Sequence, residues 1–337
     1  MKKVAFLLMI GAFALVFVAC PLPGNDDGDD ETETEQTGGE TEGETGGETG
    51  GEGEGETGEE TGGNTGGITG NSVSAVSNCV FFIEGERFTS TGGYTTATYM
   101  TKRVPVILAS GSVDQVEPVG DAIVFARLGL QDTWSVYYLL KGQNKSNDDF
   151  QYVYARGLNF TDDDSSFSKR IDATLYGRLR ETDTDNQTSH NIGLRPDDEG
   201  YFFTTSASSI TGTDFAKIDR AELTTSLTVN AGSPPHTEVE AKITVLGYRY
   251  GERDGNMGLE ISIQNSGNTD VQLNKNPRVF LMNGDDVTLF HGSFTRFPTG
   301  GLIQPGETGG YFQSATDLGN ASADKVMIIL DYQDPPR

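Results

Sequence analysis

Histidine and cysteine, which many catalytic and metal sites use, are scarce in this chain. It contains three histidines, His190, His236 and His291, and none lies at metal-ligand spacing from another. A zinc site needs several converging ligands, so this pattern argues against a metal centre. The Gly-x-Ser-x-Gly elbow of many serine hydrolases is also missing. We therefore expect a non-enzyme with no catalytic residues, no metal and no cofactor.

Basic residues are scarce. Lys and Arg number 24 against 50 Asp and Glu, which gives a formal net charge of −26. Residues 21–71 contain 16 acidic residues and no basic ones, so without them and the two N-terminal lysines residues 72–337 keep 34 acidic and 22 basic residues. A strongly negative chain repels phosphate backbones and anionic membrane surfaces. The composition argues against nucleic acid as a partner.

The N-terminus carries a short apolar run. Met1-Lys2-Lys3 is basic, Val4 to Ala19 is nearly all apolar, and Cys20 follows a small residue. Sixteen residues are too few for a comfortable transmembrane helix, which needs about 20. They fit the apolar core of a signal peptide.

Phe17-Val18-Ala19-Cys20 resembles the lipobox of a bacterial lipoprotein signal peptide, although that family usually has Leu, Val or Ile where Phe17 stands. The resemblance implies that residues 1–20 are the signal region, that cleavage leaves Cys20 at the new N-terminus, and that Cys20 carries the lipid. The membrane would then be a partner through this anchor. A secretory signal cut without lipidation is the alternative. Asp26, Asp27, Asp29 and Asp30 resemble a surface-export signal of some bacterial groups, and Pro21 departs from the Asp that marks inner-membrane retention in some bacteria. These resemblances imply an extracytoplasmic location, at the outer membrane or the cell surface.

Residues 21–71 consist largely of Gly, Thr, Glu and Asp. Such a segment cannot bury enough apolar area to offset its chain entropy, so a disordered acidic tether is expected. A neutral Gly-rich coil of this length spans roughly 40 Å, and self-repulsion extends it. A spacer and a merely solvating tail predict the same composition.

From residue 72 onward, short β-branched and aromatic runs alternate with Gly, Asn, Asp and Pro. Leu259, Ile261 and Ile263 fall on one face of such a run, with polar residues between them. Many short strands with regular turn signals indicate an all-β fold. The Gly-Ser-Pro-Pro sequence within residues 231–235 predicts a linker between a domain at 72–232 and another at 237–337. Whether residues 74–140 belong to the first domain stays open.

Ile303-Gln304-Pro305-Gly306-Glu307 precedes the aromatic pair Tyr311-Phe312, and Leu194-Arg195-Pro196 precedes Tyr201-Phe202 in the same way. These patterns resemble FxLYD-type and related β-sandwich domains of bacterial lipoproteins. Ala173-Thr174-Leu175-Tyr176 matches the name motif in part, with Gly177 in place of its Asp. The resemblance implies two tandem immunoglobulin-like β-sandwich domains, which in these families are generally non-enzymatic.

The candidate binding residues lie in the loop at 291–301. Phe294, Arg296 and Phe297 stand there among Gly, Ser, Thr and Pro, and aromatics beside Arg are common in binding patches. The alternative is that Phe294 and Phe297 plug the end of a sandwich. Cys79 is expected to be a buried small hydrophobe.

The favoured function is a binding or interaction module at the cell envelope, with an unidentified protein or polysaccharide ligand. A structural envelope component is the first alternative. An extracytoplasmic hydrolase or carbohydrate-active protein is the second.

Overall fold

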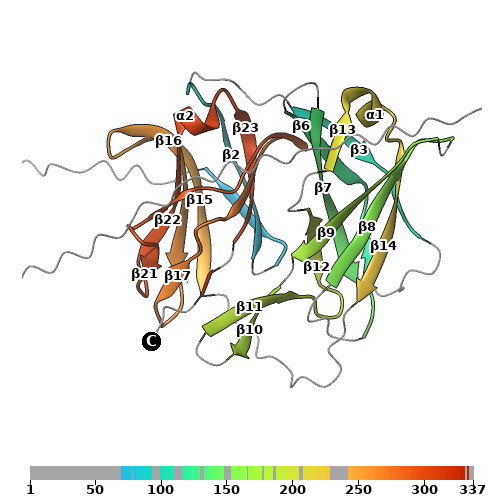
Figure 1. The fold of residues 1–337 in the computed structure, drawn as a ribbon. Coiled ribbons are helices and arrows are strands. Elements are labelled where there is room, and N and C mark those ends of the chain that lie inside the picture. Colours follow the sequence, from blue (N-terminus) through green and yellow to red (C-terminus); the bar gives the residue numbers. More distant parts are fainter. Residues whose placement is uncertain are drawn as a thin grey trace, which may run out of the picture. The chain divides into compact units, whose positions relative to one another are not determined.

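The computed structural model is all-β in the part of the chain that it describes, as the sequence predicts (Figure 1). Twenty-four strands and two short helices, α1 (Gly212–Ala216) and α2 (Ala315–Leu318), make up its regular structure. The described residues are 70–77, 79–92, 99–109, 116–129, 133–147, 153–164, 166–176, 178–184, 187–204, 208–227, 242–330 and 332–333. Cys20, the expected tether and the expected linker at 231–235 lie outside them.

One part of the fold is a sandwich of antiparallel sheets. Its first sheet has the strand order β1-β2-β23-β18-β19. Its second sheet has the order β15-β16-β22-β20, and a small sheet of order β21-β17-β24 accompanies it. The bounds are β1 (Ser72–Ala75), β2 (Val80–Thr89), β15 (Ile243–Arg253), β16 (Asn256–Asn265), β17 (Val271–Leu273), β18 (Arg278–Asn283), β19 (Asp286–His291), β20 (Thr295–Phe297), β21 (Leu302–Ile303), β22 (Thr308–Ser314), β23 (Ser322–Ile329) and β24 (Tyr332–Gln333).

The sandwich combines both ends of the described chain. β2 pairs with β23 along its length, with Val80 opposite Ile329 and Ile83 opposite Val326. Residues 72–89, which the sequence analysis places in the first domain, therefore share a sheet with residues 278–329. Val80 and Ile83 are fully buried. These apolar side chains can leave water only when β23 and the facing sheet are present, which explains the long-range pairing.

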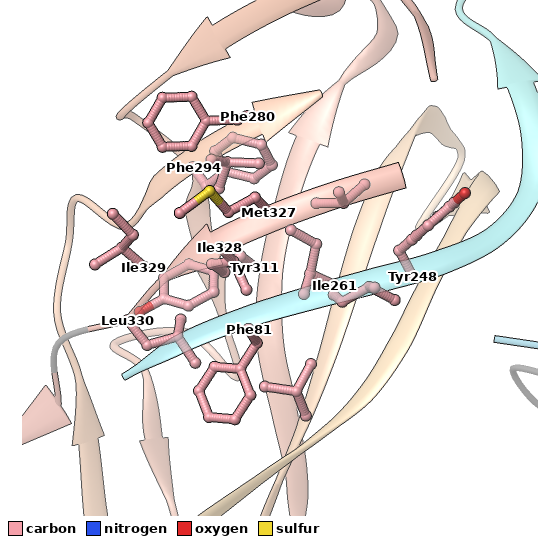
Figure 2. Close-up of a cluster of buried hydrophobic side chains, with 14 of the residues drawn as sticks. Phe81, Tyr248, Ile261, Phe280, Phe294, Tyr311, Met327, Ile328, Ile329 and Leu330 are labelled. Carbon is pink, nitrogen blue, oxygen red and sulfur yellow. The ribbon is translucent and has the colours of Figure 1, made fainter. Parts of the chain in front are cut away.

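The core of the sandwich lies between its sheets. Phe81 and Ile328 from the first sheet belong to the same buried cluster as Ile261 and Tyr311 from the second (Figure 2). The alternation predicted for residues 259–263 is confirmed, since Leu259, Ile261 and Ile263 are all fully buried.

The other part of the fold is a ten-stranded sheet that closes into a barrel. Its main path is β3-β6-β7-β12-β9-β8-β14-β4, and β5 and β13 pair with β7. The bounds are β3 (Tyr99–Val104), β4 (Val106–Leu108), β5 (Val116–Pro118), β6 (Ala122–Leu128), β7 (Thr133–Asn144), β8 (Val153–Thr161), β9 (Ser168–Tyr176), β12 (Glu199–Phe203), β13 (Ser208–Thr211) and β14 (Arg220–Leu227). A separate hairpin joins β10 (Arg178–Thr184) to β11 (Gln187–Gly193).

Pro105 marks the point of closure. It separates β3 from β4, so the two ends of the strand order are neighbours in the chain. β3 pairs with β6, while β4 pairs in parallel with β14. The Pro105 carbonyl accepts a hydrogen bond from Ala221 N at 2.9 Å. A closed sheet has no free edge, so the ten strands of this sheet form one barrel, where a two-sheet sandwich was expected from the sequence.

The strands β6, β7 and β12 are apolar on both faces. Val124, Tyr138 and Phe202 point into the barrel cluster, whereas Phe125 and Phe203 join the cluster of the sandwich. Burial on both sides explains why these segments read as continuous apolar runs.

Five aromatic residues connect the barrel to the sandwich, and we call them the aromatic junction. Phe280 lies 6.0 Å from Phe125, 5.0 Å from Phe203 and 4.9 Å from Phe290 between ring centroids. Tyr137 stacks on Phe125 at 5.4 Å and contacts Phe290 at 5.5 Å. Aromatic pairs at such distances stabilise a fold by more than the burial of their apolar surface alone.

Side chains of β3 cover the free edge of β19. The Tyr99 hydroxyl accepts a hydrogen bond from Phe290 N at 3.2 Å and lies 3.5 Å from Phe290 O, to which it donates. Thr101 Oγ1 donates to Val287 O at 3.3 Å. An open strand edge is a template for pairing with other chains, and these contacts block it.

Candidate functional site

The three candidate binding residues do not form one surface. Phe294 is 4% exposed and lies within the buried cluster that contains Phe280 and Met327 (Figure 2). The register of β20 places Arg296 opposite the buried Tyr311, and its Nη1 donates to Leu273 O at 2.7 Å. Phe297 is half-buried on the opposite face of the sheet. Of the three, only Phe297 lies on the sheet face that points away from the sandwich core.

Strand register places Phe297 on a surface that we call the outer face. Arg249 pairs with Glu260, and Glu260 pairs with Phe312, so these three side chains stand on one side of β15, β16 and β22. Phe297 lies opposite Gly310, two positions along, and so shares that side. Arg253 comes from the end of β15. The outer face is defined by Arg249, Arg253, Glu260, Phe297 and Phe312.

Arg253 joins the charged and aromatic parts of the outer face. Its guanidinium carbon lies 3.5 Å from the centroid of the Phe297 ring. Its Nη1 lies 3.2 Å from Glu260 Oε2. Guanidinium groups stack on aromatic faces while keeping donors for carboxylates. Arg253 therefore ties the edge strand β20 to the sheet centre at β16.

Glu260 is the buried centre of this network. Its side chain is 9% exposed, and Arg249 Nη2 donates to Oε2 at 2.9 Å. Ser262 Oγ donates to the other carboxylate oxygen at 3.2 Å. Both oxygens are thus hydrogen-bonded within the chain, as a buried carboxylate requires.

Two glycines provide room for the aromatic rings. A Cβ at Gly258 would lie 2.5 Å from the Phe312 ring, and a Cβ at Gly310 would lie 2.9 Å from the Phe297 ring. Each phenylalanine therefore covers a glycine on the sheet surface, an arrangement that shields exposed strand backbone.

The charges of the outer face keep its buried carboxylate ionised. Burial raises the pKa of Glu260, but the hydrogen bonds and charges of Arg249 and Arg253 outweigh burial and hold the pKa below 4.5. A general acid or base works best with a pKa near the operating pH. Glu260 stays ionised at neutral pH, so the face presents guanidinium donors and aromatic surface.

The sequence analysis did not find Arg249, Arg253, Glu260 or Phe312. The alternation of β16 did place Glu260 on the polar side of its strand, which is a usable signal. The cross-strand partners could not be read, because β15 has a bulge between Val245 and Gly247 that resets its register.

Replacing Glu260 with Gln is expected to lower the free energy of unfolding by about 2–3 kcal/mol. That is less than the usual cost of breaking a fully buried ion pair, because both guanidinium groups keep contact with water. The contribution of Glu260 is fully present above pH 4.5 and is lost as the pH falls through its lower folded-state pKa. Urea unfolding at neutral and acidic pH measures both effects.

Asp254→Asn is the matched control for Glu260→Gln. It makes the same chemical change at a side chain that is 89% exposed and lies 3.6 Å from Arg253. An exposed ion pair contributes about 0–1 kcal/mol. Equal losses in the two variants would show that the buried position of Glu260 is unimportant.

His291 lies at the end of β19 beside the buried Phe294. Its Nδ1 accepts a hydrogen bond from Ser293 N at 3.0 Å. Burial lowers the pKa of His291 below 6.5, Asp317 raises it, and Arg127 lowers it further. The neutral imidazole is thus the form that fits the folded protein.

The pKa of His291 predicts a loss of stability in mild acid. As the pH falls below 6.5 the unfolded chain takes up the proton first, so stability decreases until the lower folded-state pKa is passed. His291→Gln should reduce this decrease. The measurement is the urea midpoint of unfolding of both proteins at a series of pH values below 6.5. If the midpoint depends on pH equally in both proteins, His291 is not the group responsible.

Other expected features can be checked only within the described residues. There, no three or more His, Cys, Asp or Glu side chains are grouped so as to hold a metal ion. Cys79 is buried, as expected. None of the helices in the described part has the length and apolar character needed to cross a membrane.

Comparison with known proteins identifies no family. No protein-family model matches the chain, and no curated protein sequence matches it. Three solved structures of oxalate decarboxylase, two of them titled as the Bacillus subtilis enzyme, are weakly similar. The first is 8% identical, covers 74% of this chain and 80% of its own, and has a TM-score of 0.18. Another is 9% identical over 73% of this chain and 79% of its own, with a TM-score of 0.15. Such TM-scores do not indicate a shared fold.

Proposed function

We propose that this chain is a bacterial lipoprotein that presents its β-sheet body for binding at the cell envelope, without catalysis. The observation that carries the proposal is the N-terminal pattern of basic residues, an apolar run and Cys20 after a small residue. In this proposal Cys20 bears the lipid, and residues 21–71 hold the body away from the membrane. The location is extracytoplasmic, at the outer membrane or the cell surface.

The outer face supports the binding role. It combines an Arg-covered aromatic ring with a second half-buried ring on one side of the sheet. Arg and aromatic residues are enriched at binding hot spots. A protein or polysaccharide ligand is consistent with such a surface.

The N-terminal chemistry of the mature protein tests the anchor. Protein purified from membranes should begin at Cys20, and the mass of its N-terminal peptide should exceed the peptide mass by that of the acyl groups. Mass spectrometry after proteolysis provides the measurement. An unmodified N-terminus, or one at another residue, would overturn the proposal. Protease treatment of intact cells then reports whether the body is at the surface.

A structural envelope component is the second candidate. It is favoured by the complete hydrogen bonding of Glu260 within its own chain, which leaves that carboxylate without a need for a ligand. Binding of purified, unlipidated Cys20→Ser protein to isolated cell envelopes separates the two candidates, because the lipid would hold the wild-type protein there whatever the outer face binds. Phe297→Ala should weaken retention if the outer face binds a ligand, and should leave it unchanged if the role is structural.

A further inference from the structure

The tip of the β18–β19 hairpin contains the only Asn-Gly pair in the chain, Asn283-Gly284. Such a pair suits a tight hairpin turn, and Gly284 adopts a φ of 59°. The same pair is chemically labile. The Gly284 nitrogen can attack Asn283 Cγ, because glycine offers no side chain to hinder the approach.

The structure holds both reacting groups on one carboxylate. Gly284 N, the nucleophile, donates to Asp324 Oδ1 at 2.9 Å. The oxygen and nitrogen of the Asn283 amide are assigned here from their neighbours, by exchanging the two atoms. In that assignment Nδ2 donates to Asp324 Oδ2 at 3.3 Å and Oδ1 accepts from Arg87 Nη2 at 3.1 Å. The nucleophile and the leaving group are therefore fixed in separate hydrogen bonds.

Burial does not protect this turn. Gly284 and Asp285 are exposed, and Asn283 is half-buried. Water can reach the reacting atoms, so the hydrogen bonds to Asp324 and Arg87 are the restraint that the native structure supplies.

We propose that Asn283 is a modification site that forms a succinimide, and that Asp324 and Arg87 suppress this reaction while the protein is folded. In the reaction, the bond from Gly284 N to Asn283 Cγ forms and the Cγ–Nδ2 bond breaks. The amide proton of Gly284 leaves with the ammonia. Water then opens the ring to an aspartyl or isoaspartyl residue, and no oxidant or metal takes part.

The product would disturb more than the turn. A new carboxylate at position 283 would stand beside Asp324, replacing a donor with a charge of the same sign. Asp285 of the same turn pairs with Arg103 of β3 and lies 3.8 Å from Lys325. Modification at Asn283 is thus expected to loosen a contact between the hairpin and the barrel.

The test is the rate at which isoaspartate appears at position 283 in the full-length protein. Folded wild type, urea-unfolded wild type and folded Asp324→Ala are incubated in mildly alkaline buffer, digested, and analysed by mass spectrometry. Folded wild type should react several-fold more slowly than the unfolded chain, and Asp324→Ala should react several-fold faster than folded wild type. Asp286→Ala, which removes an exposed carboxylate from the same hairpin, is the matched control and should match wild type.

Arg87→Gln keeps the proposal testable if Asp324→Ala does not fold. It removes the donor to the amide oxygen, together with the 3.4 Å hydrogen bond from Arg87 Nε to Ser322 Oγ, and should give a rate between those of wild type and the unfolded chain. Equal rates in folded and unfolded wild type would overturn the proposal. So would a folded Asp324→Ala that reacts no faster than wild type, because the carboxylate would then not restrain the reaction.

Discussion

Replacing Cys20 with Ser is expected to abolish lipid modification and firm attachment to the membrane. Each methylene group buried in the bilayer contributes about 0.8 kcal/mol, and a single acyl chain anchors only marginally. The expected modification brings several chains to Cys20, so losing the thiol removes the whole anchor. Fractionation of cells, followed by detection of the protein in membrane and soluble extracts, measures the effect.

Two further variants make this result interpretable. Cys79→Ser removes the other cysteine of the chain, which is buried in the sandwich, and should leave partitioning unchanged. A chain whose residues 1–20 are replaced by an ordinary cleavable secretion signal should be released in soluble form. This chain tests whether an uncleaved apolar segment at residues 4–19, rather than a lipid, holds the protein in the membrane. Membrane association of this second chain at the wild-type level would refute the anchor.

Truncating Phe280 to Ala is expected to lower the free energy of unfolding by about 4 kcal/mol. Replacing a large buried aromatic residue with Ala usually costs about 3–5 kcal/mol, through lost burial and the cavity left behind. Phe280 is fully buried and contacts Phe125, Phe203 and Phe290. Since two of these come from the barrel, the substitution should weaken barrel and sandwich together.

Urea unfolding followed by both fluorescence and circular dichroism tests this expectation. Phe312→Ala is the control, because Phe312 is half-buried on the outer face and should lose only about 1–2 kcal/mol. Both probes should show one transition that shifts as a whole. Two transitions, one of them unshifted in Phe280→Ala, would mean that the aromatic junction does not couple the two parts.

The strands themselves follow from local sequence. Alternation predicted the buried side of β16 correctly at Leu259, Ile261 and Ile263, because period-two patterning reflects a sheet with one apolar face. The pairing of β2 with β23 could not be predicted this way. The sequence from Val80 to Ile83 shows only that both faces of this strand are apolar. It does not indicate which strand pairs with it.

Barrel closure escaped prediction for a related reason. Pro105 reads as an interruption between two strands, since proline cannot donate to a sheet ladder. In the structure that interruption lets one extended segment serve two neighbours, β6 and β14. The choice between a barrel and a two-sheet sandwich depends on this pairing, which the composition of residues 99–108 does not reveal.

Of the three residues named from the sequence, only Phe297 belongs to the outer face. Arg296 and Phe297 are adjacent in sequence, so they were expected to form one patch if residues 291–301 were a loop. In β20 they point to opposite faces, so one supports the sheet interior and the other faces outward. Arg253 is absent from the sequence prediction because it reaches Phe297 across two intervening strands.

The pairing of β2 with β23 sets the order in which the protein can mature. Val80 and Ile329 are 249 residues apart in the chain, so the ladder between β2 and β23 cannot form until both segments have been synthesised. Until then the apolar residues of β2 stay exposed in the nascent chain, and exposed apolar strands can aggregate or pair wrongly. Folding of this sheet therefore waits for residues 322–329 and cannot proceed strand by strand as the chain emerges.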